Sequence, residues 1–183
     1  GFFVDDYHLG IYSGANKLVA AVLMIVSAPI TMALFPVMSR KFNENIQKGF
    51  VFYKRTFLIT AIYGLFVSLL IYLFSETIVF MLLGSNFSAS VPVLKILSVL
   101  PFLVIVASML TIQGMYGLQL QRYAPFVGFI VGTVGLLINY LLIKEFNIVG
   151  AAWSYVLSEI LEILLVFSLL YFKYKTKYER KSS

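Results

Sequence analysis

The 183-residue sequence contains no cysteine and a single histidine, His8. Without cysteine the chain forms no disulfide and offers no thiolate nucleophile or cysteine metal ligand. One histidine cannot build a histidine metal cluster. The sequence also lacks the glycine-rich phosphate-binding loop of ATP-hydrolysing proteins. These absences point away from an enzyme, and we expect neither a cofactor nor a metal.

Charged residues are scarce as well, at 12% of the chain, whereas hydrophobic residues make up 61%. A soluble domain is about half apolar and about a quarter charged. A soluble fold of this size cannot hide so much apolar surface, so lipid must cover part of it. The net charge of +6 does not indicate nucleic acid, because the basic residues flank the apolar segments and form no separate basic face.

Five long apolar segments account for most of the chain. A bilayer core of about 30 Å requires roughly 20 apolar residues in a helix. β-barrel strands are excluded, because these runs are too long and do not alternate. We therefore predict an all-α, polytopic transmembrane helix bundle. Its predicted spans are 18–38, 56–74, 96–121, 123–143 and 146–172.

Charges between the spans predict the orientation of the bundle. The segment 39–55 contains five basic residues and one acid, whereas 75–92 contains one acid and no base. The positive-inside rule then places 39–55, Arg122 and the C-terminus in the cytoplasm. Residues 40–55 carry aromatic and apolar side chains at helical spacing, which suits either a surface helix on anionic lipid or a solvated loop. The basic residues 173–183 are expected to form a disordered tail.

Three local patterns resemble a known family when they are taken in order. The first is LGIYSGANKL at 9–18 with LFPVMS at 34–39, and the second is FMLLGSNF at 80–87 with VLKIL at 93–97. The third is FNIVGAAW at 146–153, with Asn139 before it and Ser158-Glu159 after it. Together they are similar to the C-terminal half of Wzx-type polysaccharide and O-antigen flippases, which belong to the MATE-like multidrug/oligosaccharidyl-lipid/polysaccharide superfamily.

The resemblance implies one lobe of a two-lobe transporter, at 1–172, followed by a basic cytoplasmic tail at 173–183. The lobe would hold five full spans and the end of a sixth, because the first residues look like the last turn of a helix. Its partners would be the lipid bilayer, an N-terminal lobe of the same polypeptide, and an oligosaccharide linked to undecaprenyl pyrophosphate. The cargo would cross the bacterial cytoplasmic (inner) membrane during O-antigen or capsule biosynthesis.

Polar residues in or beside the spans are the candidate substrate contacts. Lys17, with Asn16 beside it, can pair with a pyrophosphate or an acidic sugar, or its ammonium can simply reach to water. Lys95 is a further candidate cation at the start of the third span. Gln113 and Asn139 can bind sugar hydroxyls, although interhelical hydrogen bonds are the commoner role of such side chains.

Glu159 and Glu162 are the acidic residues inside the predicted spans. They lie about one helical turn apart and so share a face, which we expect to point into the bundle, because charge facing lipid is costly. Either carboxylate can bind a coupling proton or cation. The alternative is a structural pair bonded to hydroxyls such as those of Ser154, Ser158 or Tyr140.

Three other functions compete with flipping. A multidrug or cation antiporter of the same superfamily would share the fold but have a more apolar cavity. A membrane-embedded polysaccharide polymerase or acyltransferase would require catalytic arginine, histidine or glutamate in large outer loops, and the predicted outer loops are short and lack such a set. A structural or assembly subunit is the third alternative.

Overall fold

Helices form all the regular structure in residues 5–115 and 118–182, the part of the chain that the computed structural model describes. Side chains are described as far as Lys173. The elements in chain order are α1 (Asp6–Glu44), α2 (Ile46–Leu73), α3 (Ser75–Leu82), η1 (Ser85–Phe87), α4 (Ser90–Leu97), α5 (Leu100–Ser108), η2 (Met109–Met115), η3 (Gln121–Tyr123) and α6 (Ala124–Ser182). The predicted all-α class is confirmed.

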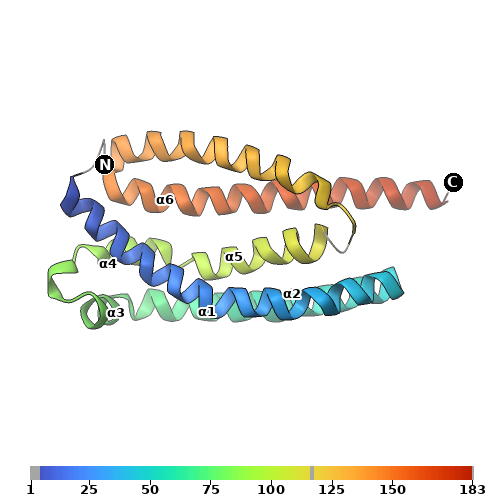
Figure 1. The fold of residues 1–183 in the computed structure, drawn as a ribbon, viewed down its shortest axis with the longest axis horizontal. Helices are drawn as coiled ribbons and strands as arrows, with labels where there is room; N and C mark the ends of the chain where they lie inside the picture. Colours follow the sequence, from blue (N-terminus) through green and yellow to red (C-terminus); the bar gives the residue numbers. More distant parts are fainter. Residues whose placement is uncertain (1–4, 116–117, 183) are drawn as a thin grey trace.

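The chain runs repeatedly along one bundle axis. Within the described residues, four helical stretches are long and apolar enough to cross a membrane, namely α1, α2, Ser90–Met115 and Gln121–Lys173. The last stretch contains Asn147, whose φ of 55° and ψ of −132° are not helical, and there α6 doubles back into two antiparallel legs (Figure 1). The chain therefore traverses the bundle five times, which confirms the predicted polytopic bundle.

The third traverse differs from its predicted bounds of 96–121. Its helical stretch begins at Ser90 and ends at Met115, and a turn at 118–120 leads into η3. Gln119 has a positive φ of 60°, and the N–H of Leu120 bonds to the carbonyl of Met115 at 2.7 Å. A left-handed residue of this kind stops a helix. The first two predicted spans lie within α1 and in α2 with its C-cap. The span 123–143 precedes Asn147, and the span 146–172 includes it near its start. Their bounds in a bilayer stay predictions.

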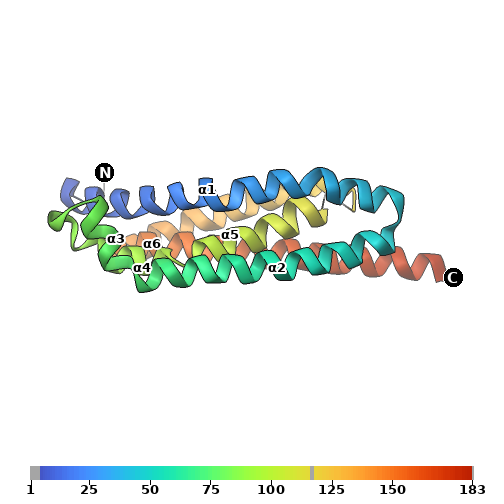
Figure 2. The same ribbon diagram turned by 90° about the horizontal axis from the view of Figure 1, so that it is seen from below.

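The basic segment 40–55 forms neither a surface helix nor a loop. Asn45 caps α2, because its Oδ1 accepts bonds from the N–H groups of Gln47 and Lys48 at 2.9 and 3.1 Å. α1 and α2 therefore form one tight hairpin (Figure 2). The 39 residues of α1 span about 58 Å, well beyond a bilayer core of about 30 Å.

This projecting end of the bundle is rich in cations, and we call it the basic end. Its basic residues with described side chains are Arg40, Lys41, Lys48, Lys54, Arg55, Arg122 and Lys173. The expectation of a disordered tail is wrong, because α6 continues as a helix to Ser182. Lysine, arginine and glutamate are good helix formers, so the helix propagates past the apolar segment.

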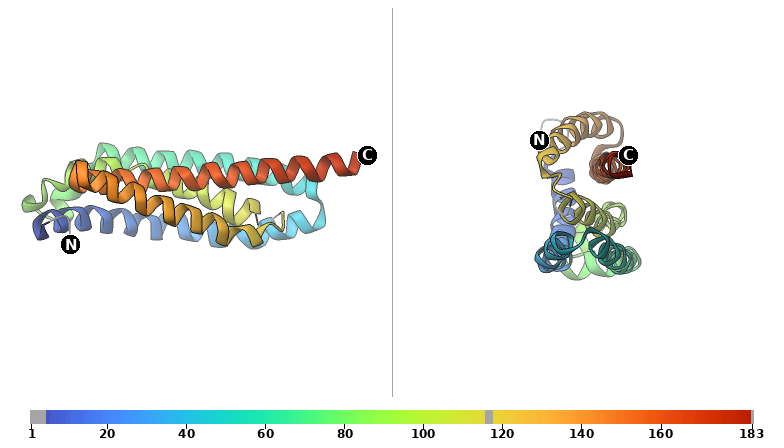
Figure 3. Two further views of the ribbon diagram at one scale, coloured as in Figure 1. Left: turned by 90° about the horizontal axis from the view of Figure 1, so that it is seen from above. Right: turned by 90° about the vertical axis from the view of Figure 1, so that its right-hand side faces the viewer.

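The core lies around the central stretch made of α4, α5 and η2. Of its apolar window, 67% is buried inside the bundle, against 11% of the corresponding window in α1. Viewed end-on, the α1–α2 hairpin and the α6 hairpin lie on opposite sides of this stretch (Figure 3). Since the outer helices expose their apolar surface, lipid must cover them.

The turn between the two legs of α6 depends on Gly150. A Cβ at this position would collide with the carbonyl group of Leu142 on the facing leg. We predict that Gly150→Ala lowers the apparent melting temperature in detergent, measured by circular dichroism, since overpacking costs about 1–3 kcal/mol. Gly132→Ala is the matched control: a Cβ there meets nothing within 4 Å, so its melting temperature should be unchanged or slightly higher. Equal melting temperatures for the two variants would contradict the close contact.

Candidate functional site

The short π-helix η2 is the irregular part of the central stretch. π-helical turns are rare and are frequently found at functional sites. Polar bonds reach η2 from three surrounding helices, through Thr31 of α1, Tyr53 of α2 and Glu162 of α6. Its own contributions are the side chains of Thr111 and Gln113 and the carbonyl of Met109. We call this set of bonded groups the polar hub.

The bond between Thr111 and Glu162 connects η2 with the second leg of α6. Thr111 Oγ1 donates to Glu162 Oε1 at 3.0 Å, and Glu162 is half-buried. Glu159 lies one turn earlier and is also half-buried. The serines considered as partners bond within their own helix instead, Ser154 to the carbonyl of Ala151 and Ser158 to that of Ser154. The partner that the structure gives to Glu162 is therefore on a neighbouring helix.

Gln113 connects η2 with α1. Its Nε2 donates to the carbonyl oxygen of Thr31 at 3.1 Å, and the side chain is only 1% exposed. Within the described part of the chain, Gln113 Oε1 and the buried Ser27 Oγ have no hydrogen-bond partner. A cavity of about 330 Å³ is lined in part by Ser27, Thr31 and Ser108, and Gln113 is not among its lining residues. Unpaired buried polar atoms are costly, so these two atoms mark a strained place where α1 meets η2.

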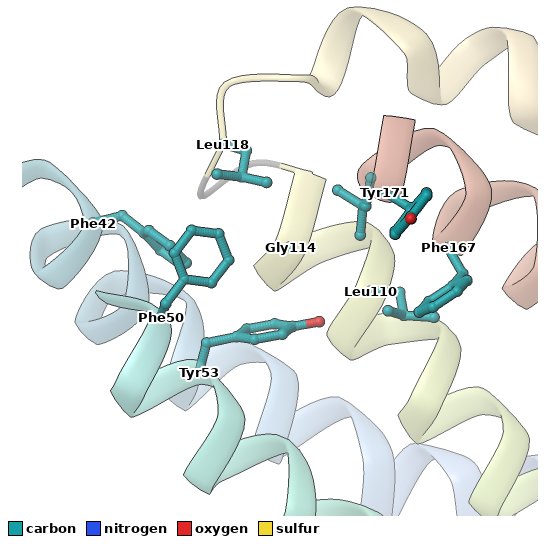
Figure 4. Close-up of a pocket in the computed structure, with 9 residues that line it drawn as sticks. Phe42, Phe50, Tyr53, Leu110, Gly114, Leu118, Phe167 and Tyr171 are labelled. Carbon is teal, nitrogen blue, oxygen red and sulfur yellow. The ribbon is translucent and has the colours of Figure 1, made fainter. Parts of the chain in front are cut away.

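Tyr53 connects η2 with α2 and borders a second cavity, of about 190 Å³. Its hydroxyl donates to the carbonyl of Met109 at 3.3 Å. Figure 4 shows its ring between Phe42 and Phe50 on one side and Phe167 on the other. Gly114 keeps the cavity open, because a Cβ there would lie 3.0 Å from Leu170 Cδ1 and 3.4 Å from the hydroxyl oxygen of Tyr53.

The remaining predicted residues lie outside the polar hub. Lys95 Nζ forms an ion pair with Glu76 Oε1 at 3.1 Å, which gives this cation a partner inside the chain. Lys17 is exposed on α1 and forms no ion pair within the described residues, and Asn16 beside it is half-buried. Asn139 is half-buried on the first leg of α6. The structure thus brings Gln113 and Glu162 to the same short helix and leaves the others elsewhere.

The sequence did not reveal several members of the hub. Thr31, Tyr53 and Thr111 are ordinary polar residues within apolar segments, and their partners lie between 51 and 82 positions away in the chain. The one indication of the hub in the sequence was Gly114, because neighbouring side chains approach the helix backbone there. Hydropathy alone gives no information about such pairings.

Comparison of the sequence with known proteins assigns the chain to a family. A family described as "Polysaccharide biosynthesis protein" matches residues 1–92, half of the chain. A protein of Escherichia coli (strain K12) named "Putative O-antigen transporter" is 27% identical over 169 residues, which cover 91% of this chain and 40% of that relative. No solved structure shows a significant match. The chain belongs to the polysaccharide biosynthesis protein family, which confirms the resemblance to Wzx-type flippases that its glycine-bearing patterns indicated.

Proposed function

We propose that the chain takes part in flipping a lipid-linked oligosaccharide repeat unit across the bacterial cytoplasmic membrane. The repeat unit would be carried on undecaprenyl pyrophosphate and used for O-antigen or capsule biosynthesis. The family and the name of the E. coli relative support a polysaccharide cargo. The observation that carries the transport role is the polar hub, because carboxylates inside a lipid-covered bundle are costly and mark ion or substrate pathways.

The chain spans 40% of the length of the relative that it matches, so the activity of a whole transporter is part of the proposal. In this proposal the N-terminal lobe of the same polypeptide faces this one, and the cargo passes between them. Alternating access is largely rocking or gating of one helix bundle against another, and we propose that a change in helix packing within this lobe accompanies it. The bonds of the polar hub are suited to that change, since each connects η2 with a different helix.

Glu162 is the proposed coupling residue, with Glu159 one turn away as a second carboxylate for the same ion. A hydrogen bond to an ionised carboxylate is about twice as strong as one between neutral groups. Binding of a proton or a cation to Glu162 would therefore weaken or replace its bond with Thr111, and η2 and α6 would separate more easily. This step joins the ion gradient to helix movement without any further cofactor.

Lys17 is the proposed contact for the pyrophosphate or for an acidic sugar, because its ammonium is exposed. Asn16 and Asn139 are proposed to bind sugar hydroxyls. Lys95 is a weaker candidate, because a substrate anion would have to displace Glu76. The position of Gln113 favours a structural role, since its amide already holds α1 against η2.

The orientation follows from the charges. The basic end carries seven described cations and the acid Glu44, whereas Asp5, Asp6 and Glu76 belong to the opposite end. We propose that the basic end and the C-terminus lie in the cytoplasm.

Deletion of the complete gene is expected to abolish surface polysaccharide and to leave single lipid-linked repeat units on the cytoplasmic face. A flippase is required before the repeat unit reaches the outer face, so the accumulated units should resist a membrane-impermeant sugar oxidant in intact cells. The measurement is extraction and quantification of labelled lipid-linked sugars. Accessible single units would indicate a polymerase defect instead, and normal surface polysaccharide would overturn the proposal.

Substitution of the coupling residue should separate transport from folding. In the complete protein, Glu162→Gln is expected to lower surface polysaccharide about tenfold, because a neutral amide cannot exchange a proton or cation. Thr111→Val should have a smaller effect, since it removes one hydrogen bond and leaves the carboxylate. Glu145→Gln, an exposed acid outside the hub, is the matched control and should match the wild type. The measurement is complementation of the deletion, with membrane protein level determined by immunoblot; full activity of Glu162→Gln would exclude the coupling role.

The absence of cysteine makes the orientation directly measurable. Lys48→Cys at the basic end and Ser85→Cys in η1 both replace exposed residues at opposite ends of the bundle. In an otherwise cysteine-free complete protein, a membrane-impermeant maleimide should label Cys at position 85 in spheroplasts and position 48 only after permeabilisation. The reverse pattern would invert the proposed topology.

A further inference from the structure

Two cations share one aromatic ring near the basic end. Arg122 Cζ lies 4.9 Å and Lys173 Nζ lies 5.2 Å from the centroid of the Tyr123 ring. Arg122 Nη2 also donates to the hydroxyl of Tyr123 at 3.0 Å. Among the side chains that the structure describes, neither cation forms an ion pair with a carboxylate. The positive charge of this pair is therefore not balanced by those side chains, and a bound anion would balance it.

An aromatic cavity lies beside this pair of cations. It is the cavity of about 190 Å³ that η2 lines in part, and its lining consists of phenylalanine, tyrosine, leucine and glycine (Figure 4). Leu170 lines the cavity, and Lys173 is one helical turn further along the same face of α6. Tyr123 and Leu170 also pack in the same hydrophobic cluster as Leu110, another lining residue. The cavity and the cations are thus neighbouring parts of one surface.

The surroundings indicate the class of ligand. Among the described residues that line the cavity there is no charged or amide side chain, and its polar groups include the hydroxyls of Tyr53, which is bonded to the carbonyl of Met109, and Tyr171. Such a cavity suits a hydrocarbon chain. The charges around it suit a phosphate, because the described side chains of the basic end comprise seven cations and one acid, Glu44. A ligand that satisfies both features has an acyl chain joined to an anionic headgroup.

We propose that this surface binds an anionic phospholipid, with one acyl chain in the aromatic cavity and the phosphate between Arg122 and Lys173. Arg122 and Lys173 stand at the ends of the apolar legs of α6. Phospholipid phosphates lie at the same level, where helices leave the hydrocarbon core. Basic residues near an anionic membrane surface are attracted to its headgroups. The site does not rest on the transport proposal, because binding is measured without cargo.

The test is a lipid titration of the purified complete protein in detergent, followed by native mass spectrometry. Phosphatidylglycerol is expected to bind at least tenfold more tightly than phosphatidylcholine with the same acyl chains. The double variant Arg122→Gln/Lys173→Gln should lose about tenfold or more of the affinity for phosphatidylglycerol. Lys144→Gln, which removes an exposed cation at the opposite end of the bundle, should bind like the wild type.

A second variant tests the cavity without changing charge. Leu118→Trp places a large ring in the cavity and should lower phosphatidylglycerol affinity, whereas Phe126→Trp, at an exposed position outside the cavity, should not. Both charge substitutions are at exposed residues, so they test the site even if Leu118→Trp fails to fold.

Three outcomes would overturn the proposal. Equal affinity for the two phospholipids would show that no anion is selected, and unchanged affinity of the double variant would place the phosphate elsewhere. A tenfold preference for undecaprenyl phosphate over phosphatidylglycerol, lost in the same double variant, would assign the surface to the polyprenyl carrier.

Discussion

A bilayer interior offers no water to polar groups, so polar groups in this bundle depend on partners within the protein. This requirement fixes the central stretch in its place. Ser90 Oγ donates to the carbonyl of Ile11, and the N–H of Phe102 donates to Ser68 Oγ. Further along, the polar hub continues the series at η2. These bonds set the register of the buried helix against α1, α2 and α6, which uniform apolar contacts would leave loosely defined.

The same requirement bears on the change of helix packing that is proposed at the hub. A hydrogen bond between polar groups that are buried from water is costly to break. Its loss must be compensated by a new hydrogen bond or by a change in the charge of one of the groups. A carboxylate can meet that condition by taking up an ion, whereas an amide such as that of Gln113 cannot. Within one short helix, the structure thus places a fixed connection to α1 beside a titratable connection to α6.

The sequence was informative where hydropathy decides the outcome. The repeated apolar segments predicted the polytopic bundle. The loop charges predicted its orientation in the membrane, which stays a prediction. Hydropathy did not predict that Asn45 would cap α2 and extend the hairpin through 40–55, nor that a left-handed Gln119 would end the third traverse early. Pairings across the fold were equally hidden from the sequence: the partner of Lys95 is Glu76, 19 positions earlier in the chain.

The turn at Asn147 and Gly150 also limits how α6 can deform. The backbone of one leg is in close contact with Gly150 on the other, so the two legs cannot slide past each other at that end. A hairpin held in this way has one soft coordinate, the angle between its legs, and its displacement grows with distance from the turn. The amplitude is therefore greatest at the far end, where η3 leads into the first leg and the second leg passes Lys173. A change in the angle between the two legs of α6 therefore changes the distance between Tyr123 and Lys173.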